Sequence, residues 1–101
     1  MKVKSLKESL IAIVDDEPSV TSLLSTLLEY EGYKAICFNS GSEFLKYLET
    51  GRVDIVLLDI MMPGVTGYDV IKSIREHETV EYTPILIISS LTDRETRLKA
   101  L

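Results

Sequence analysis

The chain has 101 residues, of which 46% are hydrophobic and 27% are charged, a composition typical of one soluble globular domain. Its net charge of -5 and its isoelectric point near 4.8 argue against direct nucleic-acid binding. The sequence has no apolar run long enough for a membrane span and no recognisable signal peptide, and its single cysteine, Cys37, excludes an internal disulfide, so we expect a cytoplasmic protein.

Strands and helices are predicted to alternate along the first half of the chain. Leu10–Val14 is a continuous apolar run, typical of a parallel strand covered on both faces. Pro18 opens a helix, and Gly32 ends it. Residues 34–38 form a second predicted strand, on which we expect Cys37 to be a core residue. The helix between these strands has apolar residues at spacings of three and four: Val20, Leu23, Leu24, Leu27 and Leu28.

The alternation continues in the second half. A second helix ends at Gly51, a third buried strand covers residues 54–59, and a loop containing Pro63 follows. A third helix then leads to a fourth strand over residues 84–89, and a last helix runs to the end of the chain. Three pairs with capping-box spacing mark the starts of these helices: Ser40 with Glu43, Thr66 with Asp69, and Thr92 with Glu95.

This order predicts a single α/β domain over residues 1–101, with a parallel sheet and right-handed crossovers. In such a sheet the carboxyl ends of the strands lie along one edge, where ligands bind. Asp15 and Asp16 follow the first strand, Asp59 ends the third, and Ser89 ends the fourth. We therefore expect these polar side chains to lie close together.

Three converging carboxylates repel one another unless a cation lies between them. Oxygen ligands suit a hard octahedral ion, and Mg²⁺ fits this set best. The alternative is that these acids are merely solvated or cap helices, with Asp16 as a candidate cap. If the metal is present, one of these carboxylates is a candidate nucleophile toward phosphorus, and a hydroxyl such as that of Ser89 is a candidate donor to a phosphoryl oxygen.

Three segments resemble the receiver domain of two-component response regulators, which has a flavodoxin-like fold. They are "IVDDEP" from Ile13, "VDIVLLDIMMPGVTGYDVI" from Val53 and "TPILIISS" from Thr83. The resemblance covers nearly the whole chain. It implies helices on both faces of a parallel sheet whose strand order is 2-1-3-4.

The resemblance also implies a role for each site residue. Asp59 is the phosphoacceptor, and its donor is a phosphohistidine of a sensor histidine kinase or a phosphotransfer protein. Asp16 and Asp59 bind Mg²⁺ directly, Asp15 binds it mainly through water, and the backbone carbonyl of Met61 is a further ligand. Ser89 contacts the phosphoryl group and acts as the switch residue. Ser90 occupies the small-residue position beside Ser89, and Pro63 and Gly67 match the loop that shapes the pocket.

The family domain continues through a fifth strand, which ends in Lys-Pro, and a fifth helix, and neither matches any part of this chain. Lys99 falls on a predicted helix and does not replace the family lysine, which pairs with the phosphoryl group. The expectation is therefore a phosphoryl-accepting receiver that is incomplete at its carboxyl terminus. The alternative is a non-switching, receiver-like interaction module that lacks the lysine.

An enzyme of the haloacid-dehalogenase type is a second alternative, but it requires an Asp-x-Asp motif on the first strand, where this chain has "VDDEPS". We therefore expect a phosphoacceptor rather than a turnover enzyme. Without a fifth strand and helix, residues 85–89 become an apolar edge, and part of the first helix's leucine stripe is uncovered. For this reason we also expect the chain to form a homo-oligomer, most simply a dimer.

Overall fold

The computed structural model describes residues 8–77 and 83–88, in which seven elements alternate. They are β1 (Leu10–Val14), α1 (Pro18–Tyr30), β2 (Lys34–Phe38), α2 (Gly41–Leu48), β3 (Ile55–Asp59), α3 (Gly67–His77) and β4 (Ile85–Ile88). The four predicted strands and the three predicted helices between them are confirmed, with ends that differ by a residue or so. The last predicted helix, from Thr92, lies outside the described residues.

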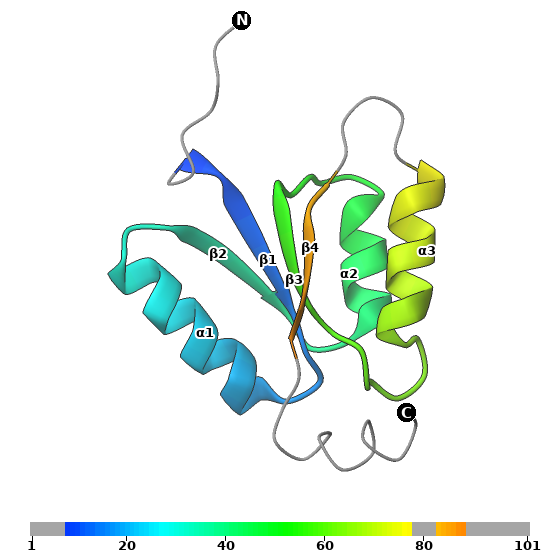
Figure 1. Ribbon diagram of the computed structural model, residues 1–101, viewed down its shortest axis with the longest axis horizontal. Helices are drawn as coiled ribbons and strands as arrows, with labels where there is room; N and C mark the ends of the chain where they lie inside the picture. Colours follow the sequence, from blue (N-terminus) through cyan, green and yellow to red (C-terminus); the bar gives the residue numbers. More distant parts are fainter. Residues whose placement is uncertain (1–7, 78–82, 89–101) are drawn as a thin grey trace, which may run out of the picture.

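All strand pairs are parallel, and the strand order is β2-β1-β3-β4. Helix α1 lies on one face of this sheet, and α2 and α3 lie on the other (Figure 1). This arrangement confirms the flavodoxin-like fold and the order 2-1-3-4. The register pairs Val14 with both Phe38 and Leu58, and Asp59 with Ile88, so the carboxyl ends of the four strands lie along one edge.

The main core lies between the sheet and the helices α2 and α3. Successive side chains of a strand point to opposite faces of the sheet, so every second residue of each strand faces this core. Phe44 of α2 is fully buried there, and its ring centroid lies 5.2 Å from that of Phe38. The buried members of this cluster are Ala12, Val14, Phe38, Phe44, Val56, Leu58, Met62, Val70 and Ile74.

The opposite face carries α1, which covers the sheet less completely. Thr21 is the one buried residue of this helix, whereas Leu23 and Leu27 of the apolar stripe are 60% and 55% exposed. Cys37 is exposed as well, so the prediction that it belongs to the core is wrong. The reason is that β2 is an edge strand of the described sheet. The Cys37 thiol still contacts α1, with Sγ 3.4 Å from the carbonyl oxygen of Thr21.

Two of the predicted capping boxes are present. Ser40 Oγ accepts a hydrogen bond from the Glu43 N–H at 3.1 Å, and Thr66 Oγ1 accepts one from the Asp69 N–H at 3.3 Å. Gly32 follows α1 with a φ of 93°, a conformation that glycine adopts without a Cβ penalty. The third pair, Thr92 with Glu95, lies outside the described residues.

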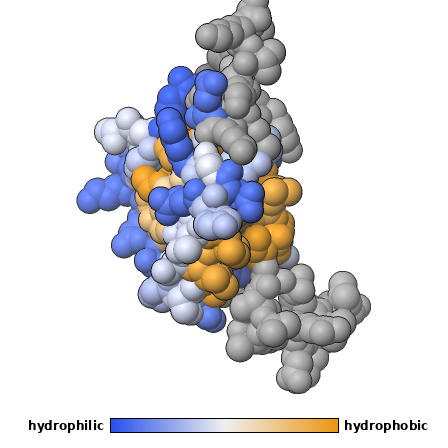
Figure 2. Space-filling view, turned by 90° about the vertical axis from the view of Figure 1, so that its left-hand side faces the viewer, coloured by the Kyte–Doolittle hydropathy of each residue, from blue (hydrophilic) through white to orange (hydrophobic). Residues whose placement is uncertain are grey.

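The surface combines strongly hydrophilic regions with an apolar region. Figure 2, viewed from the side on which α1 lies in Figure 1, shows apolar side chains gathered beside hydrophilic ones. The exposed large apolar residues include Leu23 and Leu27 on α1 and Leu86 and Ile87 on β4. Within the described part of the chain, every helix is too short or too polar to cross a lipid bilayer.

Candidate functional site

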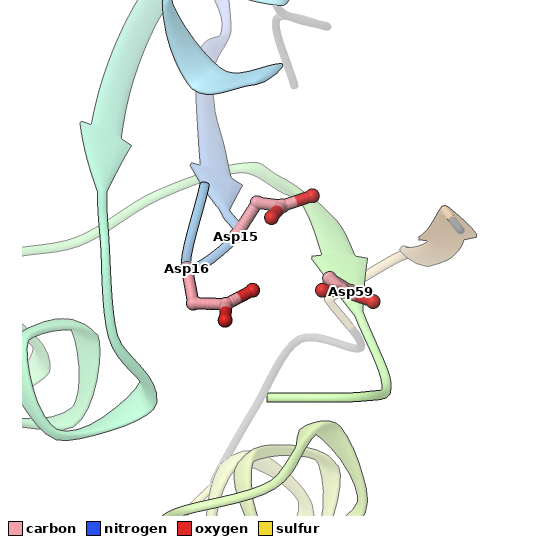
Figure 3. Close-up of side chains that lie close together, drawn as sticks. All are labelled: Asp15, Asp16 and Asp59. Atoms are coloured by element: carbon pink, nitrogen blue, oxygen red, sulfur yellow. The ribbon is translucent and has the colours of Figure 1, made fainter. Parts of the chain in front are cut away.

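Three aspartates meet at the carboxyl edge of the sheet. Asp15 and Asp16 directly follow β1, and Asp59 is the last residue of β3, the neighbour of β1. Each offers one carboxylate oxygen, and these three oxygens lie within 4.8 Å of one another. Figure 3 shows the three side chains close together at the ends of β1 and β3. Asp15 and Asp59 are both 2% exposed, whereas Asp16 is more open to solvent. The predicted convergence of these residues is confirmed.

Local backbone hydrogen bonds orient two of the carboxylates. The N–H of Glu17 donates to Asp15 Oδ1 at 2.9 Å, and the N–H of Met61 donates to Asp59 Oδ1 at 3.1 Å. Each bond joins a carboxylate to the amide two residues later, the geometry of an Asx turn. The second Asp15 oxygen, Oδ2, is buried and has no hydrogen-bond partner within the described part of the chain.

The site is electrostatically costly without a cation. Burial raises the pKa of Asp15 from 3.8 to about 6, the hydrogen bond from Glu17 opposes this rise, and the negative charges of Asp59, Asp16 and Glu17 add to it. A buried carboxylate oxygen without a donor carries a desolvation penalty that a metal ion removes. The donor set of three carboxylates, one of which carries the orphaned oxygen, therefore fits a hard divalent cation such as Mg²⁺.

The helix-cap alternative for Asp16 does not agree with the structure. The N-cap residue of α1 is Glu17, and no side-chain hydrogen bond caps this helix. Asp16 thus lies one residue before the cap position, with its carboxylate among the three that converge. A role in helix capping does not account for its position.

Gly67 packs closely against the backbone at the end of β3, next to Asp59. A Cβ atom at this position would lie 2.6 Å from the carbonyl oxygen of Asp59 and 2.5 Å from the Cα of Ile60. The Gly67 N–H donates to the Ile60 carbonyl at 3.1 Å, which holds the start of α3 against the end of β3. Only glycine allows this close approach of two backbone segments.

The remaining predicted site residues are placed only in part. The side chain of Met61 is 40% exposed, and its N–H orients Asp59, as described above. Ser89, Ser90 and Lys99 lie outside the described residues.

Asn39 and Thr21 also belong to the surroundings of the acids, and the sequence patterns did not single them out. The Asn39 side-chain amide donates to the Asp15 carbonyl at 3.2 Å and to Thr21 Oγ1 at 3.1 Å. The available signal was the place of Asn39 directly after a strand, at the same edge as the acids.

The family model described as "Response regulator receiver domain" matches residues 11–101. The chain belongs to this family. Among curated relatives of the receiver domain, the CAI-1 autoinducer sensor kinase/phosphatase CqsS of Vibrio cholerae is 41% identical over 98 residues. The response regulator SaeR of Staphylococcus epidermidis is 36% identical over 91 residues. The chain covers 14% of the length of CqsS and 38% of the length of SaeR, so it spans a minor part of either relative.

Solved structures agree with the fold of this receiver domain. The chemotaxis response regulator CheY4 of Vibrio cholerae aligns with a TM-score of 0.75 at 28% identity, over 90% of this chain and 76% of that one. The response regulator protein TrrA of Thermotoga maritima, solved in complex with Mg(2+)-BeF, aligns with a TM-score of 0.69 at 30% identity. That alignment covers 91% of this chain and 96% of TrrA.

Proposed function

We propose that Asp59 of this receiver domain accepts a phosphoryl group from the phosphohistidine of a sensor histidine kinase or a phosphotransfer protein. Asp15, Asp16, Asp59 and the backbone carbonyl of Met61 hold Mg²⁺ for this reaction. The observation that carries the proposal is the convergence of three carboxylates, one of which, that of Asp15, has a buried Oδ2 with no hydrogen-bond partner among the described residues. The Mg(2+)-BeF complex of TrrA supports it by similarity.

The residues of the site divide the chemistry between them. When bound, Mg²⁺ supplies positive charge that offsets the carboxylates and the incoming phosphoryl oxygens. The Asp59 carboxylate forms a bond to phosphorus while the phosphorus–nitrogen bond to the donor imidazole breaks, and the imidazole leaves with the electron pair. The Met61 N–H fixes the direction of the attacking carboxylate. Ser89 donates its hydroxyl hydrogen to a phosphoryl oxygen.

The product is an acyl phosphate on the protein itself, so the chain acts as a phosphoacceptor and not as a turnover enzyme. Its partner is the protein that carries the phosphohistidine. We place the reaction in the cytoplasm, in agreement with a chain whose single thiol forms no internal disulfide. Direct binding to nucleic acid is not part of the proposal, because the net charge is -5.

The test uses the purified chain, a small phosphodonor such as acetyl phosphate, and Mg²⁺. We expect intact mass spectrometry to show one added phosphoryl group that hydroxylamine removes, because hydroxylamine cleaves acyl phosphates. Asp59→Asn should abolish the addition. Asp54→Asn is the matched control and should still gain the phosphoryl group, since Asp54 lies just before the start of β3, at the opposite end of the strand from Asp59.

Two outcomes would overturn the proposal. Labelling that persists in Asp59→Asn would place the phosphoryl group elsewhere. A wild-type chain that binds Mg²⁺ without being labelled, and that shows no response to beryllium fluoride, would support the alternative of a non-switching interaction module. Beryllium fluoride is used because it imitates the phosphoryl group without needing a phosphodonor. Its binding is followed by the shifts of backbone amide NMR signals.

A further inference from the structure

We propose that Asn39 is a positioning residue of the metal site. Its side-chain amide holds the peptide group between Asp15 and Asp16 and thereby sets the direction of the Asp16 carboxylate. The inference rests on the proposed Mg²⁺ site and adds to it a residue that directly follows a third strand, β2, which contributes no carboxylate.

The geometry of the Asn39 amide is fully specified. Nδ2 donates one hydrogen to the Asp15 carbonyl oxygen at 3.2 Å and the other to Thr21 Oγ1 at 3.1 Å. The Thr21 hydroxyl donates in turn to the Pro18 carbonyl at 3.1 Å, so it faces Asn39 as an acceptor. Because both partners accept, the nitrogen and not the oxygen of the amide points toward the Asp15 carbonyl and Thr21 Oγ1.

Asn39 is itself anchored. Its N–H donates to Glu43 Oε2 at 3.0 Å, within the capping box of α2. One residue earlier, the Phe38 carbonyl accepts a hydrogen bond from the Asp15 N–H at 3.1 Å. The two peptide groups on either side of the Asp15 Cα are therefore each held by one hydrogen bond, the first by Phe38 and the second by Asn39, and together these bonds restrain the backbone at Asp15.

Asp16 depends most on this backbone restraint. The other two carboxylates are oriented directly, since Asp15 Oδ1 and Asp59 Oδ1 each accept a hydrogen bond from a backbone N–H. The Asp16 carboxylate makes no hydrogen bond to any residue in the described ranges, and it is the most exposed of the three. Its direction therefore follows from the backbone at residues 15 and 16, which Asn39 restrains.

A comparison of Mg²⁺ and Ca²⁺ affinities tests whether Asn39 positions the Asp16 carboxylate. Mg²⁺ demands near-octahedral geometry, whereas Ca²⁺ accepts six to eight ligands in flexible arrangements. Loss of a group that orients a ligand typically weakens metal binding by roughly tenfold or more. We therefore expect Asn39→Ala to raise the Mg²⁺ dissociation constant by roughly tenfold and to change the Ca²⁺ constant by less than about threefold.

Ser40→Ala is the matched control. It removes one hydrogen bond from the same corner of the molecule, the cap of α2, and touches neither Asp15 nor Thr21. Both variants are compared with wild type by calorimetric titration with each metal and by thermal unfolding. We expect Ser40→Ala to lower the melting temperature and to keep the wild-type ratio of Mg²⁺ to Ca²⁺ affinity. An equal loss of affinity for both metals in Asn39→Ala, or an equal change of the ratio in both variants, would overturn the proposal.

A second measurement needs no substitution. Asn39 is the only asparagine, and the chain has no glutamine, so a single side-chain NH₂ pair in a ¹⁵N-correlated NMR spectrum belongs to Asn39. We expect both hydrogens of this pair to shift during a Mg²⁺ titration, with the midpoint found by calorimetry. A pair that Mg²⁺ leaves unmoved would refute the link to the metal site.

These results separate the inference from the proposed function. A wild-type chain that binds no Mg²⁺ removes the metal site itself. A wild-type chain that binds Mg²⁺ and accepts phosphoryl groups, together with an Asn39→Ala variant that binds Mg²⁺ equally well, refutes only the role of Asn39.

Discussion

Asp15 combines burial with three neighbouring negative charges, so its protonation is expected to contribute to the stability of the metal-free chain. Its pKa is about 6 in the folded chain, against an ordinary value of 3.8. The folded state therefore binds this proton more tightly than the unfolded state does. Stability that depends on the proton is fully present below pH 4 and is lost as the pH rises through 6.

The first prediction is a pH dependence with this sign. Without metal, the free energy of unfolding should fall by on the order of 1 to 3 kcal/mol as the pH rises from about 4 to about 7. Urea unfolding at several pH values measures it. Mg²⁺ binding should show the opposite trend and weaken by about tenfold per pH unit below pH 6, because the metal competes with the proton. Metal affinity that stays constant from pH 7 to 5 would contradict the assignment to Asp15.

The second prediction concerns Asp16. Asp16→Ala should stabilise the metal-free chain by about 1 kcal/mol, because it removes one of the charges that repel Asp15 and Asp59. Urea unfolding without metal measures the difference. Asp69→Ala is the contrasting control and should destabilise the chain, since Asp69 accepts hydrogen bonds from Thr66 that hold its pKa below the ordinary value. A clear loss of stability in Asp16→Ala would show that the carboxylate makes favourable contacts.

At the scale of the elements, short sequence patterns correctly predicted the described strands and helix starts, because these features depend on residues close together in the chain. The apolar run Leu10–Val14 is β1, and the capping boxes at Ser40 and Thr66 begin the helices α2 and α3. The three aspartates could be brought together from the sequence because parallel strands share one carboxyl edge. That rule requires no knowledge of the register.

The features that sequence reasoning missed depend on packing between elements. The bond from Asn39 to Asp15 exists because the register sets Phe38 beside Val14, and no spacing along the chain encodes that register. The exposure of Cys37 follows from the place of β2 at the sheet edge, which an apolar strand pattern does not distinguish from a central place.

The third prediction tests the contact between β3 and α3. Gly67→Ala should destabilise the chain by about 1 to 3 kcal/mol, because the added methyl group meets backbone atoms of Asp59 and Ile60 that cannot move aside cheaply. It should also weaken Mg²⁺ binding, since the strain displaces Asp59. Chemical unfolding and metal titration measure the two effects.

Gly64→Ala is the control for this prediction. Gly64 has a φ of 73° and open space around the Cβ position, so its substitution adds backbone strain without a clash. It should leave Mg²⁺ binding nearly unchanged. Equal effects of the two substitutions on metal affinity would show that the contact at Gly67 does not position Asp59.

At the scale of the whole molecule, apolar side chains on α1 and β4 remain accessible in the described structure. Leu86 is 58% exposed and Ile87 is 44% exposed, on opposite faces of a strand that pairs only with β3 within the described part of the chain. Leu23 and Leu27 add apolar surface on α1. Exposed apolar residues beside a strand edge to which no other described strand pairs favour association between molecules.

The fourth prediction is therefore self-association of the 101-residue chain, most simply as a two-fold dimer. Sedimentation velocity at micromolar concentrations measures it. Leu86→Lys should weaken the association, because a charge on a strand edge opposes pairing. Tyr68→Ser is the control: Tyr68 is an exposed residue on α3, and its substitution should leave the association unchanged. A monomer that unfolds cooperatively at these concentrations would refute the prediction.

The central claim is that Asp59 is the phosphoacceptor of a Mg²⁺-dependent site built from Asp15, Asp16 and Asp59. Reductive trapping tests it most directly, because borohydride converts a phosphorylated aspartate into homoserine, which peptide mass spectrometry locates to a single residue. After treatment with acetyl phosphate and Mg²⁺, we predict homoserine at position 59 and none when the metal is withheld. Homoserine at Asp15 or Asp16, or a stable phosphate ester on Ser89, would contradict the account.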